Sequence, residues 1–144
     1  MRLTVHTDYA LRLLMLLAIK GEDSTTIQEV ADRYGISKNH LMKVAHELGL
    51  AGFVETTRGR GGGLKLALEP EEISLGEVVR LTEEGFNLVE CFDDERNQCF
   101  ISPDCKLRGV LSKALTAFLA VLDDYTLADL VPRRSPLRKL LLSS

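Results

Sequence analysis

Cysteine is absent from most of this 144-residue chain, because all three cysteines lie between residues 91 and 105. An odd number of thiols in one segment excludes a framework of paired disulfides, since one thiol must stay unpaired. Cys91, Cys99 and Cys105 are separated by seven and five residues, and residues 93–98 are all charged or amide-bearing. This polarity favours a loop over a buried core segment.

Long apolar runs are also missing. The longest has the seven residues 13–19 between Arg12 and Lys20, whereas a membrane-spanning helix needs about 20 residues. We therefore expect one buried helix here and no contact with a membrane. The run lacks the small-residue cleavage site of a signal peptide, so we expect a cytoplasmic protein whose reduced thiols can serve as ligands.

The usual signatures of an enzyme are lacking. The sequence contains no nucleophile paired with a base, no convincing acid–base pair of carboxylates and no GxxxxGK[ST] phosphate loop. With 45% apolar residues, the chain can bury the core of one folded domain. We expect a binding protein and not an enzyme.

The net charge of −3 is unevenly distributed. Residues 1–68 carry 9 Lys and Arg against 7 Asp and Glu, residues 69–105 carry 2 against 11, and residues 106–144 carry 7 against 3. The acidic side chains therefore surround the cysteines. The N-terminal half remains free to present a basic face to nucleic acid.

The N-terminal half has the pattern of a helix-turn-helix. Residues 8–20 form a first helix, with Thr7 or Asp8 as its cap and Gly21 at its end. A capping box at residues 26–29 starts a second helix, and a glycine-containing turn leads to a third helix at 38–48. That third helix opens with polar side chains that can reach base edges and phosphates, and we expect them to bind DNA: Ser37, Lys38, Asn39, His40 and Lys43.

A β-hairpin with a basic tip follows the third helix. Residues 53–57 and 64–68 alternate between apolar and polar side chains, and the glycine-rich residues 58–63 join them. Arg58 and Arg60 in this tip can enter a minor groove or pair with phosphates. A hairpin in this place predicts the wing of a winged helix.

The C-terminal half predicts two further helices and a tail. One helix starts at the capping box of residues 74–77 and runs to about Glu84. A longer one carries apolar residues at three- and four-residue spacing over 107–122, and we interpret it as a dimerisation helix, with burial within one chain as the alternative. Residues 125–142 predict short packing segments.

The predicted fold class is mainly α with a small β-hairpin. A winged helix-turn-helix DNA-binding domain covers residues 1–80, with its wing hairpin at 53–68. A cysteine loop covers 81–106, and a long dimerisation helix with a C-terminal tail covers 107–144. The gathered thiols predict an iron–sulfur cluster, a zinc ion or unligated thiols, and a site of four ligands would need one more donor.

Five stretches resemble the IscR-like family of winged-helix regulators, and within it the nitric-oxide-sensing iron–sulfur repressors: residues 3–12, 35–43, 58–63, 91–105 and 124–130. The resemblance runs through nearly the whole chain. It implies a homodimer that binds palindromic operator DNA while it holds an iron–sulfur cluster, with 4Fe–4S favoured over 2Fe–2S. It also implies that the dimer releases DNA when nitric oxide attacks the cluster.

The resemblance further implies the ligands of this cluster, which are the three cysteines together with an acid from the other subunit that matches Asp8. Arg12, one turn later, is a candidate coupling residue, and His6 is an alternative fourth ligand. An IscR-type protein would place a histidine three residues after the third cysteine, where this chain has Arg108.

Three other functions remain open from the sequence. They are an IscR-type regulator that responds to iron–sulfur or redox status, a zinc-stabilised repressor, and an electron carrier whose winged helix binds a protein. Metal content separates the zinc form from the others. Palindrome-dependent DNA binding by the cluster form separates a regulator from an electron carrier.

Overall fold

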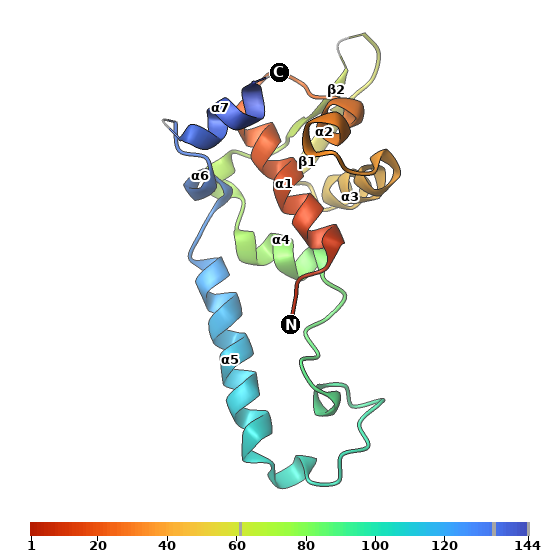
Figure 1. The fold of residues 1–144 in the computed structure, drawn as a ribbon, viewed down its shortest axis with the longest axis vertical. Coiled ribbons are helices and arrows are strands. Elements are labelled where there is room, and N and C mark those ends of the chain that lie inside the picture. The colour runs from red at the N-terminus through yellow and green to blue at the C-terminus, as the bar shows by residue number, and fades with distance from the viewer. Residues whose placement is uncertain (61, 134, 144) are drawn as a thin grey trace.

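The computed structural model describes residues 1–60, 62–133 and 135–143 and shows a mainly helical chain with one β-hairpin (Figure 1). Gly61 of the expected wing tip, and Arg134 and Ser144 of the expected tail, lie outside the described residues. The order of the elements confirms the predicted fold class, a winged helix-turn-helix followed by a long additional helix.

Helix α1, Val5–Lys20, lies at the centre of the core. The prediction that it begins at Thr7 or Asp8 is wrong. The hydroxyl of Thr4 accepts a hydrogen bond from the backbone N–H of Thr7 at 3.2 Å, so the helix begins one turn earlier and Asp8 lies inside its first turn. Its almost completely buried leucines are Leu13, Leu14, Leu16 and Leu17.

Helices α2, Ile27–Tyr34, and α3, Lys38–Leu50, form the helix-turn-helix. Thr26 and Ser37 cap them, since each hydroxyl accepts a backbone N–H of the first turn, at 3.1 and 3.3 Å. Gly35 ends α2 with φ +64°, a left-handed conformation that glycine adopts without steric cost. As the apolar pattern predicts, the buried residues of α3 are Leu41, Val44, Ala45 and Leu48.

The wing is an antiparallel hairpin of β1, Val54–Thr57, and β2, Gly63–Leu66. Thr25 pairs with Leu64 through two backbone hydrogen bonds of 2.7 and 2.9 Å. This bridge ties the base of the wing to the segment before α2, and Leu64 is buried in the shared core. The wing and the helix-turn-helix therefore form one packed unit.

Helix α4, Leu75–Thr82, follows the short turn η1, Pro70–Glu72, and packs against α1. The hydroxyl of Ser74 caps α4, which ends two residues before the predicted end. The hydroxyl of Thr82 donates a 2.8 Å hydrogen bond to that of Thr7, and both side chains are buried. A polar contact inside the core thus joins α4 to the first turn of α1.

Helix α5, Lys106–Asp123, extends away from the winged helix (Figure 1). None of its 18 residues, all of which the structure describes, is buried. The alternative that this helix is buried within one chain is therefore wrong. Its C-terminal end is attached to α4, because Arg80 makes a two-point ion pair with Asp123 and holds the pKa of that carboxyl below its usual range. The large apolar side chains most exposed on α5 are Leu107, Val110 and Val121.

The tail folds back onto the core as α6, Leu127–Leu130, and α7, Pro136–Leu142. Leu127 and Leu141 are buried in the same core as α1, which confirms the predicted packing segments. No helix among the described residues is long and apolar enough to cross a membrane.

Candidate functional site

The three cysteines lie on the irregular segment between α4 and α5, at the end of the molecule opposite the wing (Figure 1). Cys91 is buried in the short turn η2, Glu90–Phe92, whereas Cys99 and Cys105 are half-buried on either side of η3, Ser102–Asp104. All three are free thiols. The structure therefore keeps three soft donors on one segment.

Two residues that the sequence reasoning missed shape the turn at Cys99. The side-chain oxygen of Asn97 accepts the backbone N–H of Cys99 at 3.0 Å, and its amide donates to the hydroxyl of Ser102 at 2.9 Å. Ser102 in turn donates to the carbonyl oxygen of Cys99 at 2.8 Å. An asparagine two residues before a cysteine was the available signal, because asparagine favours this local turn.

A cavity of about 590 Å³ separates the cysteine segment from α5. Cys105 lines it, together with the rings of Phe86 and Phe92 and the side chain of Arg108. The Nη2 atom of Arg108, on α5, lies 3.8 Å from the Oδ1 atom of Asp94 on the cysteine segment. The position at which an IscR-type protein would have a histidine is thus occupied by a cation that faces an acid.

Within one chain the donors are not gathered at a single point. Among the residues that the structure describes, no group of three or more His, Cys, Asp or Glu side chains is placed to hold a metal ion. The donor chemistry still fits a soft metal or an iron–sulfur cluster, since three free thiols lie on one segment and one of them borders a cavity.

Asp8 is a half-exposed carboxylate that Arg12 holds in place. Arg12 donates from Nε to Oδ1 at 3.2 Å and from Nη2 to Oδ2 at 2.8 Å. The Asp8 side chain is 48% exposed, so a second molecule can reach it. The Tyr34 hydroxyl donates to the carbonyl oxygen of Arg12 at 2.8 Å, and burial raises the pKa of Tyr34 to about 12.

Most of the predicted DNA-binding residues are exposed on two adjacent elements, α3 and the wing. The hydroxyl of Ser37 also serves as the cap of α3. Four of these exposed residues belong to the helix-turn-helix: Ser37, Lys38, Asn39 and Lys43. The other two, Arg58 and Arg60, belong to the part of the wing tip that the structure describes. A helix and a basic hairpin side by side can contact a groove and the phosphates beside it.

His40 differs from the other predicted DNA-binding residues, because its ring packs on α1. It stacks on the ring of His6 with 5.6 Å between centroids and meets the ring of Tyr9 edge-on at 4.8 Å. The Nε2 atom of His6 lies 2.5 Å from a carboxylate oxygen of Glu47 on α3. His6, the alternative fourth ligand, is therefore engaged with α3 in this chain. The sequence reasoning missed this cluster, since its members are up to 41 residues apart.

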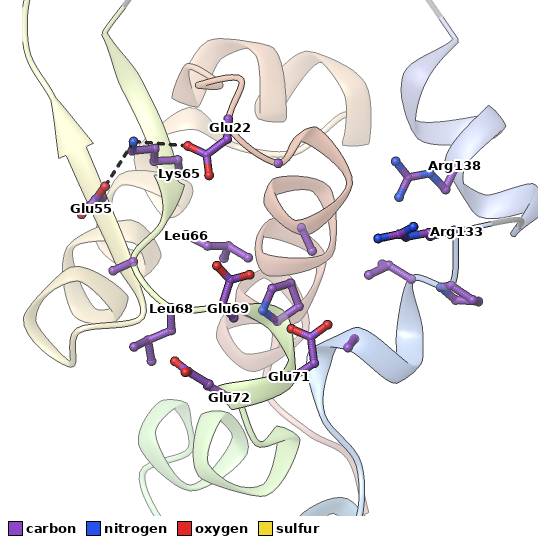
Figure 2. Close-up of a pocket in the computed structure, with 17 residues that line it drawn as sticks. Glu22, Glu55, Lys65, Leu66, Leu68, Glu69, Glu71, Glu72, Arg133 and Arg138 are labelled. Carbon is purple, nitrogen blue, oxygen red and sulfur yellow. Dashed lines mark ion pairs between the residues drawn. The ribbon is translucent and has the colours of Figure 1, made fainter.

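A groove of about 620 Å³ at the base of the wing contains none of the predicted site residues (Figure 2). The Nζ atom of Lys65 on β2 lies 3.8 Å from a carboxylate oxygen of Glu22 and 3.5 Å from one of Glu55. On the opposite side, Arg138 of α7 donates to the carbonyl oxygen of Ile19. These contacts connect the wing and the tail to the end of α1, and we assign the groove a structural role.

Comparison with known proteins identifies the family. The profile of the Rrf2 family, described as iron-dependent transcriptional regulators, matches residues 3–133. The chain belongs to the Rrf2 family. Among Rrf2-type regulators, it is 57% identical over 143 residues to the HTH-type transcriptional regulator NsrR of Bacillus subtilis strain 168, covering 98% of this chain and 97% of that protein. It is 56% identical over 142 residues to NsrR of Bacillus licheniformis, covering 98% and 99%.

Solved structures agree with this membership of the Rrf2 family. The cysteine regulator CymR of B. subtilis is 30% identical, with a TM-score of 0.75 over 90% of this chain and 95% of that one. IscR of T. potens is 27% identical, with a TM-score of 0.71 over 90% and 85%. The expectation of a regulator and not an enzyme agrees with the names of these relatives.

Proposed function

We propose that this Rrf2-family chain is a homodimeric transcriptional repressor that binds palindromic operator DNA in the cytoplasm and responds to nitric oxide. The observation that carries the proposal is the set of three free thiols on one segment of a chain that is 57% identical to an NsrR. When bound there, an iron–sulfur cluster, 4Fe–4S in preference to 2Fe–2S, would supply the reaction with nitric oxide that releases the operator.

The proposal divides the chain into three segments with separate tasks. Residues 1–80, with the wing hairpin at 53–68, bind DNA. Residues 81–106 hold the cluster, and residues 107–144 form the dimer. The exposed apolar stripe of α5 supports the last assignment, because a helix of this composition is stabilised by burial against another helix.

Cys91, Cys99 and Cys105 would be three of the ligands, and Asp8 of the partner subunit would be the fourth. The exposure of Asp8 supports an intersubunit donor, since a half-exposed carboxylate can be reached by a second chain. In this chain Arg12 donates a hydrogen bond to each carboxylate oxygen of Asp8. Asp8 thus has two competing uses, and Arg12 is the residue that would hold it when it is not a ligand.

The DNA-binding face would consist of the exposed residues Ser37, Lys38, Asn39, Lys43, Arg58 and Arg60, with His40 behind them, where its ring packs on α1. In a dimer, two such faces read half-sites about one helical turn, or roughly 34 Å, apart. A small displacement of one α3 relative to the other therefore weakens binding strongly. A change at the first turn of α1, against which α3 packs, is suited to produce such a displacement.

Metal analysis tests the proposal first. Protein purified without oxygen should contain iron and acid-labile sulfide in near-equal amounts, close to one whole cluster per chain. It should bind a palindromic duplex that it selects from a randomised library, and a nitric oxide donor should release that duplex. Zinc in place of iron, or DNA binding that nitric oxide does not alter, would contradict the proposal.

A further inference from the structure

The first turns of α1 are fastened to α3 by a cluster of four side chains. His6 and Tyr9 come from α1, and His40 and Glu47 come from α3. The His6 ring stacks on His40 with an interplanar angle of 23°, and its Nε2 atom bonds to Glu47 at 2.5 Å. One imidazole therefore contacts α3 at two points.

These two points lie seven residues apart on α3, which is about two helical turns along the same face. His40 is in the first turn of α3, and Glu47 is near its C-terminal end. Contacts at two such separate points fix the direction of α3 as well as its distance from α1.

The position of His6 on α1 relates this cluster to the proposed ligand. Asp8 lies two residues after His6 and one residue before Tyr9, so all three share the same stretch of helix. Just before it, the backbone N–H of Thr4 donates to a carboxylate oxygen of Glu83 at 2.8 Å, where the cysteine segment begins. The start of α1 is thus bonded on one side to the cysteine segment and on the other side to α3.

We propose that His6 is a positioning residue that transmits the state of Asp8 to the recognition helix, through its hydrogen bond to Glu47 and its stack on His40. This inference rests on the proposed function. The core leucines of α1 and α3 hold the two helices together whatever Asp8 binds. The His6–Glu47 pair is different, since it is at the rim, with the two side chains 26% and 35% exposed, and can shift with the first turn.

The test compares how strongly the cluster changes DNA affinity in each variant. The measurement is the ratio of the Kd of the metal-free protein to that of the cluster-loaded protein, on the duplex selected by the wild type. His6→Ala and Glu47→Ala should each lower this ratio by about fivefold or more, the lower end of usual coupling between sites. The double variant should lower it no further than His6→Ala, because the hydrogen bond that Glu47→Ala removes is already absent when His6 is alanine.

Two further variants and one further readout separate transmission from general stability. His6→Gln keeps a side-chain donor for Glu47 but loses the ring stack on His40, so its ratio should lie between those of the wild type and His6→Ala. His46→Ala, on the exposed side of α3, should leave the ratio unchanged. In the metal-free protein, His6→Ala should speed amide hydrogen exchange in residues 38–50 and not in 75–82. If His6→Ala does not fold, Glu47→Ala carries the same test.

Equal weakening of both forms by His6→Ala and Glu47→Ala, or an unchanged ratio, would overturn the role of His6. A wild-type ratio close to one would be a different result, because it would refute the proposed function itself and the inference with it. The wild-type measurement therefore tells the two failures apart.

Discussion

Arg12 donates a hydrogen bond to each carboxylate oxygen of Asp8, four residues earlier on α1. The pair is on the surface, with both side chains more than 40% exposed, so its net contribution to stability is on the order of 1 kcal/mol or less. A carboxylate held this weakly can exchange its partner for a metal at low cost. A buried pair would resist that exchange.

Replacing Asp8 by alanine should leave a cluster that assembles on the three cysteines but has altered spectra or an altered response to nitric oxide. An oxygen donor is a poor match for iron–sulfur chemistry, so its loss changes the site without emptying it. Absorption and circular dichroism during titration with a nitric oxide donor measure the effect. Asp23→Ala, which removes an exposed carboxylate just after α1, is the control. Spectra and a response identical to wild type would remove Asp8 from the site.

Changing any one of the cysteines to alanine should abolish the cluster and relieve repression. Cys99→Ala is the sharpest case, because Cys99 is half-buried on the segment between α4 and α5 and is not part of the hydrophobic core. In the metal-free state, the free energy of unfolding of this variant should differ from that of the wild type by no more than about 0.5 kcal/mol, as for most substitutions outside the core. Iron analysis and circular dichroism give the two readouts. A Cys99→Ala protein with full iron content would contradict the prediction.

Replacing Lys43 or Arg60 by alanine should weaken operator binding and flatten its salt dependence. Each phosphate contact contributes about 0.9 to the slope of log Kobs against log salt concentration, and a dimer loses one contact in each half-site. Binding isotherms at several salt concentrations measure this slope. Lys113→Ala removes an exposed lysine from α5, far from the DNA face, and should keep the wild-type slope. If both Lys43→Ala and Arg60→Ala are silent, the DNA face is wrongly placed.

Val110→Glu on α5 should convert the dimer to a monomer. The side chain is 60% exposed within one chain, so the substitution leaves the fold of that chain intact. In a dimer it would bury two carboxylates in an apolar interface, and we expect a loss of affinity between subunits on the order of 100-fold or more. Sedimentation measures the assembly, with Thr116→Glu, an exposed position on the polar side of the same helix, as the control. A Val110→Glu dimer as tight as wild type would move the interface elsewhere.

The raised pKa of Tyr34 should make the fold less stable at alkaline pH. Its pKa is about 12 in the folded chain, against about 10 for an unfolded chain. The folded state therefore keeps the proton over a range in which the unfolded state loses it, and stability falls as pH rises from about 10 to about 12. The decline is at most roughly 2–3 kcal/mol. Urea unfolding should show it in wild type and in Tyr125→Phe, whose tyrosine is 49% exposed, but not in Tyr34→Phe.

The local signals of the sequence were sufficient for most of the fold. Gly35, Ser37 and the apolar period of α3 mark the helix-turn-helix, because caps and turns depend on neighbouring residues. The start of α1 was misplaced, since Thr4, Thr7 and Asp8 are all plausible caps. In the fold the Thr4 hydroxyl caps the helix, while that of Thr7 is buried against Thr82 of α4.

The candidate site was less predictable. The cysteines are visible as a pattern within fifteen residues, and Asp8 entered through resemblance to a family. The contacts of His6 and His40 could not be read from the sequence, because they join α1 to α3 and depend on how two helices cross. A histidine at the start of a recognition helix favours a contact with DNA, while the same ring in the fold packs against α1.

Helix α5 buries none of its residues within its own chain, so in the proposed dimer the stability of the protein would depend on its concentration. If the helix is completed by a second copy, dilution removes that packing, and the unfolding temperature should rise with the amount of protein in the sample. Below the Kd of the dimer, the number of complete metal sites would fall roughly with the square of the chain concentration. The rate at which a cell makes this chain would then set how many working sensors it has, before any signal arrives.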